Sequence, residues 1–408
     1  MASPPSRQTP APSLARTGRR IGLGLAALAV AAGLWIPNVH WLYRPDVNAH
    51  LVPAGLPPRT EELAARQLRL WLDPQARAGE IRRMRASNAE WDFMGRTFLV
   101  LSLANLSLRD PARAAACAPV MDAILDETLR LERERGMYVF LMDYARAGRF
   151  VGKPARSLFV DGEIALMLAA RRLVAERAEY RPLLHDRLAA MIAAMRQSRV
   201  LLAESYPDEC WMFDHATALA AMRAADALDG TDHRPFLREW LALAREKHTH
   251  PATGLLCSSL TTDGGVSDGP EGSTIWWVAH ALQVVDRPFA ADQYARAKRE
   301  LIREVGGFAY GREWPVSWQG PMDIDSGPII PGLQASAGSS GLAFVGAAAF
   351  GDRALLRQLL GSVYLAGFPV RQGGQLRFCA SNQVGDAVLL YALTLGPLWQ
   401  EIERRAPQ

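Results

Sequence analysis

One ten-residue stretch of this 408-residue chain concentrates carboxyl groups, a thiol and an imidazole. It runs from Tyr206 to His215 (YPDECWMFDH) and leads into the apolar segment ATALAA at 216–221, which predicts the start of a buried helix. A helix start presents unpaired backbone N–H groups and the positive end of the helix dipole. Polar side chains gathered there either cap the helix or form a site.

Four residues are the candidates for catalysis: Asp92, Cys210, Asp214 and His215. Capping does not explain Asp214 and His215, because they lie about one turn into the predicted helix. We expect the aspartates and His215 to transfer protons, and Cys210 to lie close by as a nucleophile or proton donor whose pKa the helix start would lower. The structural alternatives are a buried thiol for Cys210 and a core histidine bonded to a backbone carbonyl for His215.

Acids and aromatic residues also cluster at the starts of the other apolar helices. The candidate substrate-binding residues among them are Trp91, Tyr144, Glu163, Glu271, Trp277, Trp318, Asp323 and Asp325. Carboxyl groups that face one opening suit acid–base work on a sugar or an alcohol, and the aromatic rings suit a sugar face or an apolar substrate. For each single acid, helix capping is the alternative. The acids lie on different helices without a histidine pair, so we expect no metal or other cofactor.

The elements that must position these residues are almost all helical. From Thr60 onward, apolar residues recur at three- and four-residue spacing, and the predicted helices form six pairs. The pairs are 61–72 with 91–108, 111–133 with 158–175, 182–204 with 211–228, 235–248 with 272–285, 290–305 with 326–350, and 354–366 with 383–398. A break of the helix 326–350 at Pro331 is the alternative for that segment. The first member of each pair is amphipathic and the second is more apolar. This pattern predicts an all-α (α/α)6 toroid over 59–403, with the inner-helix N-termini at one mouth. An open α-solenoid is the alternative.

The N-terminus has the composition of a membrane-targeting segment. Residues 1–20 predict a disordered tail, 21–43 a transmembrane anchor, and 44–58 a Pro-rich linker. Arg16, Arg19 and Arg20 flank the apolar run, so we expect the tail in the cytoplasm and the large domain on the periplasmic side of the inner membrane. A cleaved signal peptide is the alternative.

Composition narrows the classes of partner. Apolar residues make up 49% of the chain, charged residues 22%, and the net charge is only +4, which excludes a strongly basic nucleic-acid binder. The four cysteines are Cys117, Cys210, Cys257 and Cys379. They form no CxxC pair, and Cys117 is expected in the core. An oxidising compartment would permit disulfides, but four cysteines allow three connectivities and the sequence does not choose among them.

Three short motifs resemble the linalool dehydratase/isomerase-like family of bacterial (α/α)6 proteins. They are EWDFM at 90–94 with RTF at 96–98, PDECW at 207–211 with Asp214, and DIDSGP at 323–328. The resemblance covers about residues 60–395. It implies a cofactor-free enzyme that protonates and removes a tertiary hydroxyl group from a monoterpene alcohol, using Asp, His, Tyr and a pair of Cys. It also implies a ring-shaped homo-oligomer outside the cytoplasm; Cys210 is the cysteine in the matching stretch.

We therefore expect a membrane-anchored, extracytoplasmic acid–base lyase or isomerase with an acidic funnel. The first alternative is a glycoside hydrolase or polysaccharide lyase that acts on an envelope glycan. The second is a non-catalytic envelope binding module, in which all the acids would serve as caps and no pocket would open. The partners expected are a small-molecule or glycan substrate and the membrane, and no nucleic acid.

Overall fold

The computed structural model describes residues 14–43, 45–51, 55–320, 322 and 326–407. Fifteen α-helices dominate these residues, and the β-strands are at most four residues long. The all-α prediction is therefore confirmed.

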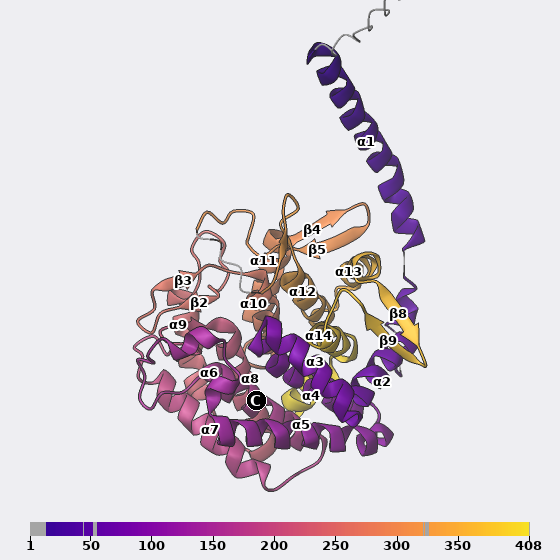
Figure 1. The fold of residues 1–408 in the computed structure, drawn as a ribbon. Helices are drawn as coiled ribbons and strands as arrows, with labels where there is room; N and C mark the ends of the chain where they lie inside the picture. Colours follow the sequence, from indigo (N-terminus) through magenta and orange to yellow (C-terminus); the bar gives the residue numbers. More distant parts are fainter. Residues whose placement is uncertain (1–13, 44, 52–54, 321, 323–325, 408) are drawn as a thin grey trace, which may run out of the picture.

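Helix α1 (Leu14–Leu42) projects away from the helical body (Figure 1). Its segment Thr17–Ile36 spans 20 residues and is long and apolar enough to cross a membrane. A signal sequence near an N-terminus has the same character, so both interpretations of the sequence remain compatible with this helix. The helix begins at Leu14, so the prediction that the irregular tail continues to residue 20 is wrong.

Six inner helices form a closed ring. They are α4 (Ala89–Arg109), α6 (Leu158–Val174), α8 (Met212–Asp229), α10 (Gly272–Ala281), α12 (Ala337–Ala349) and α14 (Gln383–Thr394). Each packs on the next, and α14 packs on α4, which completes the circle. Gly95 lies so close to Gln383 that any side chain would collide with it. The closed contact between the first and last helices confirms the toroid and excludes an open solenoid.

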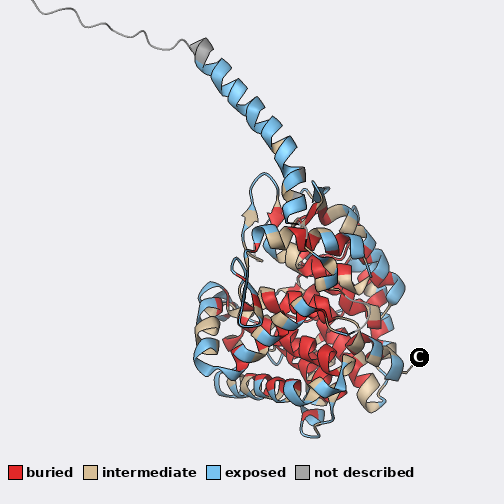
Figure 2. Cartoon of the chain, turned by 90° about the vertical axis from the view of Figure 1, so that its right-hand side faces the viewer, coloured by how far each residue is buried: buried red, intermediate tan, exposed pale blue. Residues whose placement is uncertain are grey.

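Six outer helices surround this ring. They are α2 (Pro58–Leu72), α5 (Ala114–Arg135), α7 (Tyr180–Met195), α9 (Arg234–Lys247), α11 (Arg287–Leu301) and α13 (Arg353–Ala366). The inner helices are buried almost all round, as in α6, where every residue from Leu158 to Leu173 is buried. The outer helices bury one stripe and expose the rest (Figure 2). The predicted division into amphipathic and apolar members follows from this difference.

Two further helices were not predicted as separate elements. Helix α3 (Pro74–Ser87) is strongly charged and buries only Met84, so it lacks the apolar periodicity that would reveal it. Helix α15 (Pro397–Arg405) packs against α4, α6 and α8. The Leu398 N–H donates to Asn105 Oδ1 at 2.9 Å, near the C-terminal end of α4. Helix α15 therefore covers the end of the ring opposite the inner-helix N-termini.

Short antiparallel strands occupy the connections that precede the inner helices. They are β1 (Cys210–Trp211), β2 (Ser259–Leu260) and β3 (Val266–Asp268) in one sheet, and the pairs β4 (Ile302–Val305) with β5 (Phe308–Gly311), β6 (Ile329–Ile330) with β7 (Ala335–Ser336), and β8 (Pro369–Gln372) with β9 (Gln375–Phe378). The predicted helix 326–350 does not form in its first part, which is β6 and β7, and the alternative of a break at Pro331 is confirmed. Pro331 lacks a backbone donor, and Gln334 turns the chain with a φ of 55°.

Five short 3₁₀ helices complete the described structure. They are Val47–Ala49, Pro111–Arg113, Met137–Val139, Asp143–Arg146 and Leu282–Val284.

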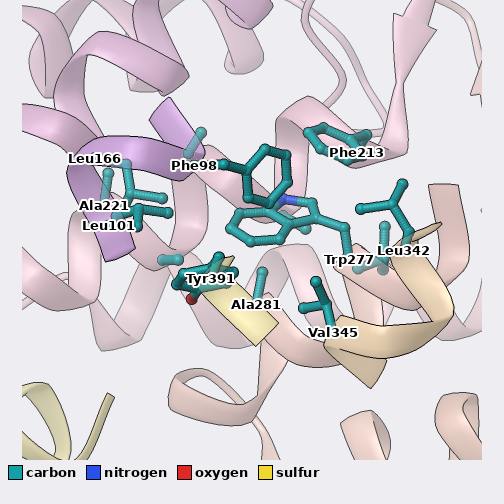
Figure 3. Close-up of a cluster of buried hydrophobic side chains, with 14 of the residues drawn as sticks. Phe98, Leu101, Leu166, Phe213, Ala221, Trp277, Ala281, Leu342, Val345 and Tyr391 are labelled. Atoms are coloured by element: carbon teal, nitrogen blue, oxygen red, sulfur yellow. The ribbon is translucent and has the colours of Figure 1, made fainter. Parts of the chain in front are cut away.

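Aromatic side chains fill the interior of the ring (Figure 3). Trp277 stacks on Phe213 at 5.4 Å between ring centroids and meets the edge of Phe98 at 5.3 Å. Its indole N–H donates to Thr217 Oγ1 at 2.8 Å, so its one polar atom is paired. Trp277 is only 1% exposed, and its expected role as a substrate-binding residue at the mouth is wrong for this structure. It is a core residue.

Candidate functional site

Four helix starts at the mouth of the ring are capped by neutral side chains. Asn88, Ser157, Ser336 and Asn382 accept hydrogen bonds from the first turns of α4, α6, α12 and α14. The N-cap positions of α8 and α10 make no side-chain cap bond. The first turn of α10 is capped from outside, because the Ser273 N–H donates to Glu313 Oε1 at 3.0 Å. Glu163 and Asp214 are not caps, whereas the non-catalytic binding module requires all the acids to serve as caps.

Glu163 and Asp214 form the centre of the candidate site. Glu163 lies on α6 and Asp214 on α8, two helices that pack side by side, with Gly162 directly against the backbone of Asp214. Their exposed fractions are only 1% and 5%. Glu163 Oε2 makes no hydrogen bond with any residue that the structure describes. Two carboxyl groups thus lie on neighbouring helices in the interior, and no cationic side chain of the described residues forms an ion pair with either.

Burial raises the pKa of both acids. It raises the pKa of Glu163 to about 8; the Thr97 hydroxyl opposes this shift and the Asp214 carboxyl adds to it. It also raises the pKa of Asp214 to about 8, opposed by the Ser205 hydroxyl and assisted by Glu90. A buried carboxyl group without a counter-charge favours its neutral form. This pair therefore holds protons at neutral pH, as a general acid must.

Tyr206 and Glu90 continue this cluster toward the surface. The Tyr206 hydroxyl donates a short hydrogen bond to Glu90 Oε1 and accepts one from the Met142 N–H at 2.9 Å. Burial and the neighbouring Glu90 carboxylate raise the pKa of Tyr206 well above its ordinary value. Tyr206 thus stays protonated, and its hydroxyl group links the Glu90 carboxylate to the Met142 backbone.

An aromatic platform forms the outer edge of the site. Tyr144 is 50% exposed and stacks on Tyr206 at 4.8 Å between ring centroids. The Tyr144 hydroxyl and the Trp211 indole N–H donate to the same oxygen, Glu209 Oε2, at 3.0 and 3.1 Å. An exposed aromatic ring such as Tyr144 beside a carboxylate matches the apolar faces and the hydroxyl groups of a sugar. Tyr144 is thus well placed for its expected substrate-binding role.

Glu204 holds the loop that carries this platform. Its buried carboxylate accepts hydrogen bonds from the backbone N–H groups of Val151 at 2.9 Å, Gly152 at 2.7 Å and Asp208 at 2.7 Å. Asp208 adopts a φ of 58°, a left-handed conformation that such anchoring maintains. The loop therefore presents Tyr206 and Glu209 in a fixed geometry.

His215 does not face the candidate site. Its Nδ1 bonds the Trp211 carbonyl at 2.7 Å, and its Nε2 accepts from the Ala203 N–H at 3.0 Å. Burial lowers its pKa to about 3, so the ring stays neutral. The expectation that His215 transfers protons is wrong for this structure, because both ring nitrogens are occupied by backbone groups. The alternative of a core histidine is confirmed.

Cys210 also differs from the expectation. It lies on β1, is fully buried, and burial together with Glu204, Asp208 and Glu209 raises the pKa of its thiol. The prediction of a lowered pKa is therefore wrong, since low polarity and nearby acids outweigh the helix start. Cys117 and Cys257 are buried, Cys379 is exposed, and all four cysteines are free thiols.

Asp92 is committed to a structural ion pair. Its carboxylate bonds Arg96 at 3.0 Å and Arg85 at 3.2 Å, and Arg96 also reaches Glu127 at 3.0 Å. Asp92 and Arg96 are both 2% exposed. A carboxylate held by two guanidinium groups is a poor proton shuttle, so the expected role of Asp92 in proton transfer is not supported by this geometry.

The remaining sequence candidates are spread around the mouth. Glu271 is the buried N-cap residue of α10, where its N–H donates to Ser258 Oγ at 2.9 Å. Trp318 is partly exposed and meets the edge of His250 at 5.1 Å. Trp91 is partly exposed on the first turn of α4. Asp323 and Asp325 lie outside the described residues.

Sequence reasoning left Tyr206, Glu209 and Thr97 out of the candidates. Tyr206 and Glu209 lie within the stretch 206–215, but their spacing in the sequence does not predict a role in a site. Among the residues that the structure places, no group of three or more His, Cys, Asp and Glu side chains is arranged to hold a metal ion.

Comparisons with known proteins concern the fold. No protein-family model matches the sequence, and no curated protein matches it. The chain is similar to a GH76 alpha-mannanase from Bacteroides thetaiotaomicron, with a TM-score of 0.46 and 12% identity over 76% of this chain and 87% of that chain. It is also similar to a polysaccharide lyase, with a TM-score of 0.44 and 10% identity over 81% of this chain and 96% of that chain. Similarity at this level does not indicate the activity of this protein, which depends on its own side chains.

Proposed function

We propose that this protein is a cofactor-free acid–base enzyme that cleaves glycosidic bonds in an envelope glycan. The observation that carries the proposal is the pair of buried, uncharged carboxyl groups, Glu163 and Asp214, which Glu90 links to the aromatic platform of Tyr144 and Tyr206. Helix α1 would anchor the enzyme to the inner membrane with the toroid on the periplasmic side.

The chemistry follows from the protonation of the pair. One carboxyl group would donate its proton to the glycosidic oxygen as the bond from that oxygen to the anomeric carbon breaks. The carboxylate left by this transfer would then take a proton from the water that adds to the anomeric carbon, while the second, still protonated carboxyl group would donate hydrogen bonds to the reacting groups. Acid, base and water together account for every atom of a hydrolysis. Because the acid must be protonated, we expect activity to fall as the pH rises above about 8.

The platform supports a sugar rather than a small apolar substrate. Tyr144 offers a ring face that is half exposed, and Glu209 offers carboxylate oxygens beside it. A pyranose has an apolar face for the ring and hydroxyl donors for the carboxylate. A terpene alcohol has only one hydroxyl group and would leave most of these polar atoms unused.

The second candidate is the alcohol dehydratase that the sequence motifs resemble. One observation favours it: the interior of the ring beside α6 and α8 is apolar, with Phe213 stacked on Trp277 and the edge of Phe159 against Phe93. In that reaction an acid would protonate the hydroxyl group, water would leave, and a base would take a proton from the neighbouring carbon to give an alkene.

The test compares the full-length protein in detergent with two variants, Glu163→Gln and Asp214→Asn. Thermal shift and product analysis would be run with oligosaccharides, including mannan fragments, and with small terpene alcohols. We expect oligosaccharides to stabilise the protein and to be cleaved, and both variants to lose about 10²–10⁴-fold in kcat. Conversion of terpene alcohols alone would favour the second candidate instead.

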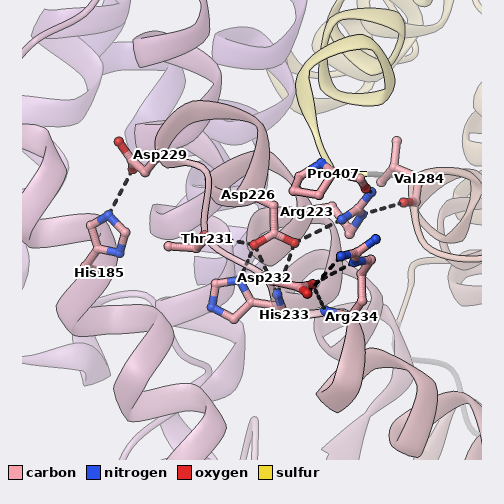
Figure 4. A network of polar contacts seen from close by, with 10 residues as sticks. All are labelled: His185, Arg223, Asp226, Asp229, Thr231, Asp232, His233, Arg234, Val284 and Pro407. Carbon is pink, nitrogen blue, oxygen red and sulfur yellow. Dashed lines mark hydrogen bonds and ion pairs between the residues drawn. The ribbon is translucent and has the colours of Figure 1, made fainter.

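Asp226→Asn is the matched control (Figure 4). Asp226 is also a buried aspartate of α8, but it lies twelve residues further on, about 18 Å along the helix axis. It accepts hydrogen bonds from Thr231 Oγ1 at 2.8 Å and Arg223 at 3.0 Å. This variant should lose stability but keep its activity per folded molecule. Equal loss of activity in all three variants would refute a specific role for the acid pair.

A further inference from the structure

A cavity lies beside the start of α14, and neither Glu163 nor Asp214 is among its lining residues. Its volume is about 440 Å³, and α2, α3, β9 and the first turn of α14 line it. Helix α14 is the ring neighbour of α4, whose own start carries Glu90. The cavity therefore lies at the same end of the ring as Glu163 and Asp214, with α4 between α14 and α6.

The cavity carries an excess of positive charge. Its charged lining residues are Arg66, Arg83, Arg377, Glu80 and Asp386. Arg66 and Arg83 share Glu80, with the Arg66 contact at 3.2 Å. Arg377 is exposed on β9 and forms no ion pair with a described residue. Three guanidinium groups against two carboxyl groups leave at least one positive charge without a counterpart, which is the environment that an anionic ligand needs.

Asp386 supplies a second, independent feature. Its side chain is 6% exposed, it lines the cavity, and its Oδ1 accepts no hydrogen bond from any described residue. Burial raises its pKa to about 7; a hydrogen bond with the Phe378 backbone and the charges of Arg66 and Arg377 act against that shift, and Glu80 adds to it. A buried carboxyl oxygen without a donor is costly in an empty cavity, and a ligand hydroxyl group would satisfy it.

We propose that this cavity binds an acidic sugar unit of the glycan. Its anionic group would pair with Arg377 and Arg66, and one of its hydroxyl groups would donate to Asp386 Oδ1. The recognised chemistry is a carboxylate or a phosphate ester on a hydroxylated ring. This inference rests on the proposed function, because it makes the cavity a subsite for the same substrate.

Cys379 allows binding to be measured without any activity. It lines the cavity and is exposed, whereas Cys117, Cys210 and Cys257 are buried. The rate at which a maleimide modifies Cys379 in the full-length protein therefore reports occupancy. The probes are a galacturonic acid trisaccharide, a hexose 6-phosphate and, as the neutral reference, galactotriose.

We expect the trisaccharide acid or the sugar phosphate to slow modification at concentrations at least about tenfold below those needed for galactotriose. Whichever of these two sugars protects Cys379 at the lower concentration identifies the preferred anion as a carboxylate or a phosphate. Arg377→Gln should raise the protecting concentration about tenfold or more. Arg371→Gln, which removes the same charge from the same hairpin but pairs with Glu62 at 2.8 Å outside the cavity, should leave it unchanged.

Equal protection by the neutral and the acidic sugars, or equal protection in Arg377→Gln and the wild type, would overturn the subsite. Glu163→Gln separates this inference from the proposed function. Protection that survives in Glu163→Gln would support the subsite independently of catalysis. The absence of glycan cleavage by the wild type, with protection retained, would refute the cleavage activity and leave the subsite standing.

Discussion

Replacing Asp214 with asparagine should flatten the dependence of stability on pH. The pKa of Asp214 is raised from 3.8 to about 8 in the folded protein, whereas the unfolded chain has the ordinary value. Between these two pH values the folded state holds a proton that the unfolded state has lost. The stabilisation linked to this group is therefore complete below about pH 4 and is lost as the pH rises toward 8.

The magnitude follows from linkage. Each pH unit within this window removes about 1.4 kcal/mol per group, so the free energy of unfolding should fall by about 2.7 kcal/mol between pH 5 and pH 7 through Asp214 alone. Glu163 adds a coupled contribution of the same sign, since its pKa is also raised, from 4.5 to about 8. In Asp214→Asn no proton is bound at this position, so its share of the slope should disappear.

The assay is urea unfolding in detergent, followed by tryptophan fluorescence at pH 5, 6, 7 and 8. Leu219→Ala serves as the control, because Leu219 is fully buried on the same helix but does not titrate. It should lower stability by about 2–5 kcal/mol at every pH, parallel to the wild type. If Asp214→Asn also runs parallel to the wild type, Asp214 is ionised in the folded protein at neutral pH, and the general-acid argument fails.

Three further substitutions test the structural roles assigned above. Arg96→Met should lower the free energy of unfolding by about 3–5 kcal/mol, because it leaves the Asp92 carboxylate buried with a weaker partner; an unchanged urea midpoint would contradict this. His215→Phe should cost about 1–3 kcal/mol by leaving the Ala203 N–H without an acceptor, yet keep the pH profile of kcat, which a proton-transfer role would alter. Cys210→Ala should keep kcat within about threefold; abolished turnover would instead restore the thiol to the mechanism.

Much of the architecture could be predicted because helix periodicity is a local property. The pairs such as 354–366 with 383–398 agree closely with α13 and α14, since each helix has to bury the stripe that its own sequence carries. The predictions of helices failed where the apolar stripe of the helix is weak. Charged α3 has almost no buried face, and the segment around Pro331 forms a hairpin where an apolar sequence suggested a helix.

The sequence by itself determined that acids would gather at the inner-helix starts, because helix order and ring closure bring those starts together. Only the tertiary structure decided what each acid does. Asp92 and Asp214 look alike in sequence, yet one meets two arginines and the other meets a second buried carboxyl group. The protonation of a carboxyl group depends on its burial and on neighbours from helices distant in the sequence. The spacing of residues along the chain does not indicate which neighbours those are.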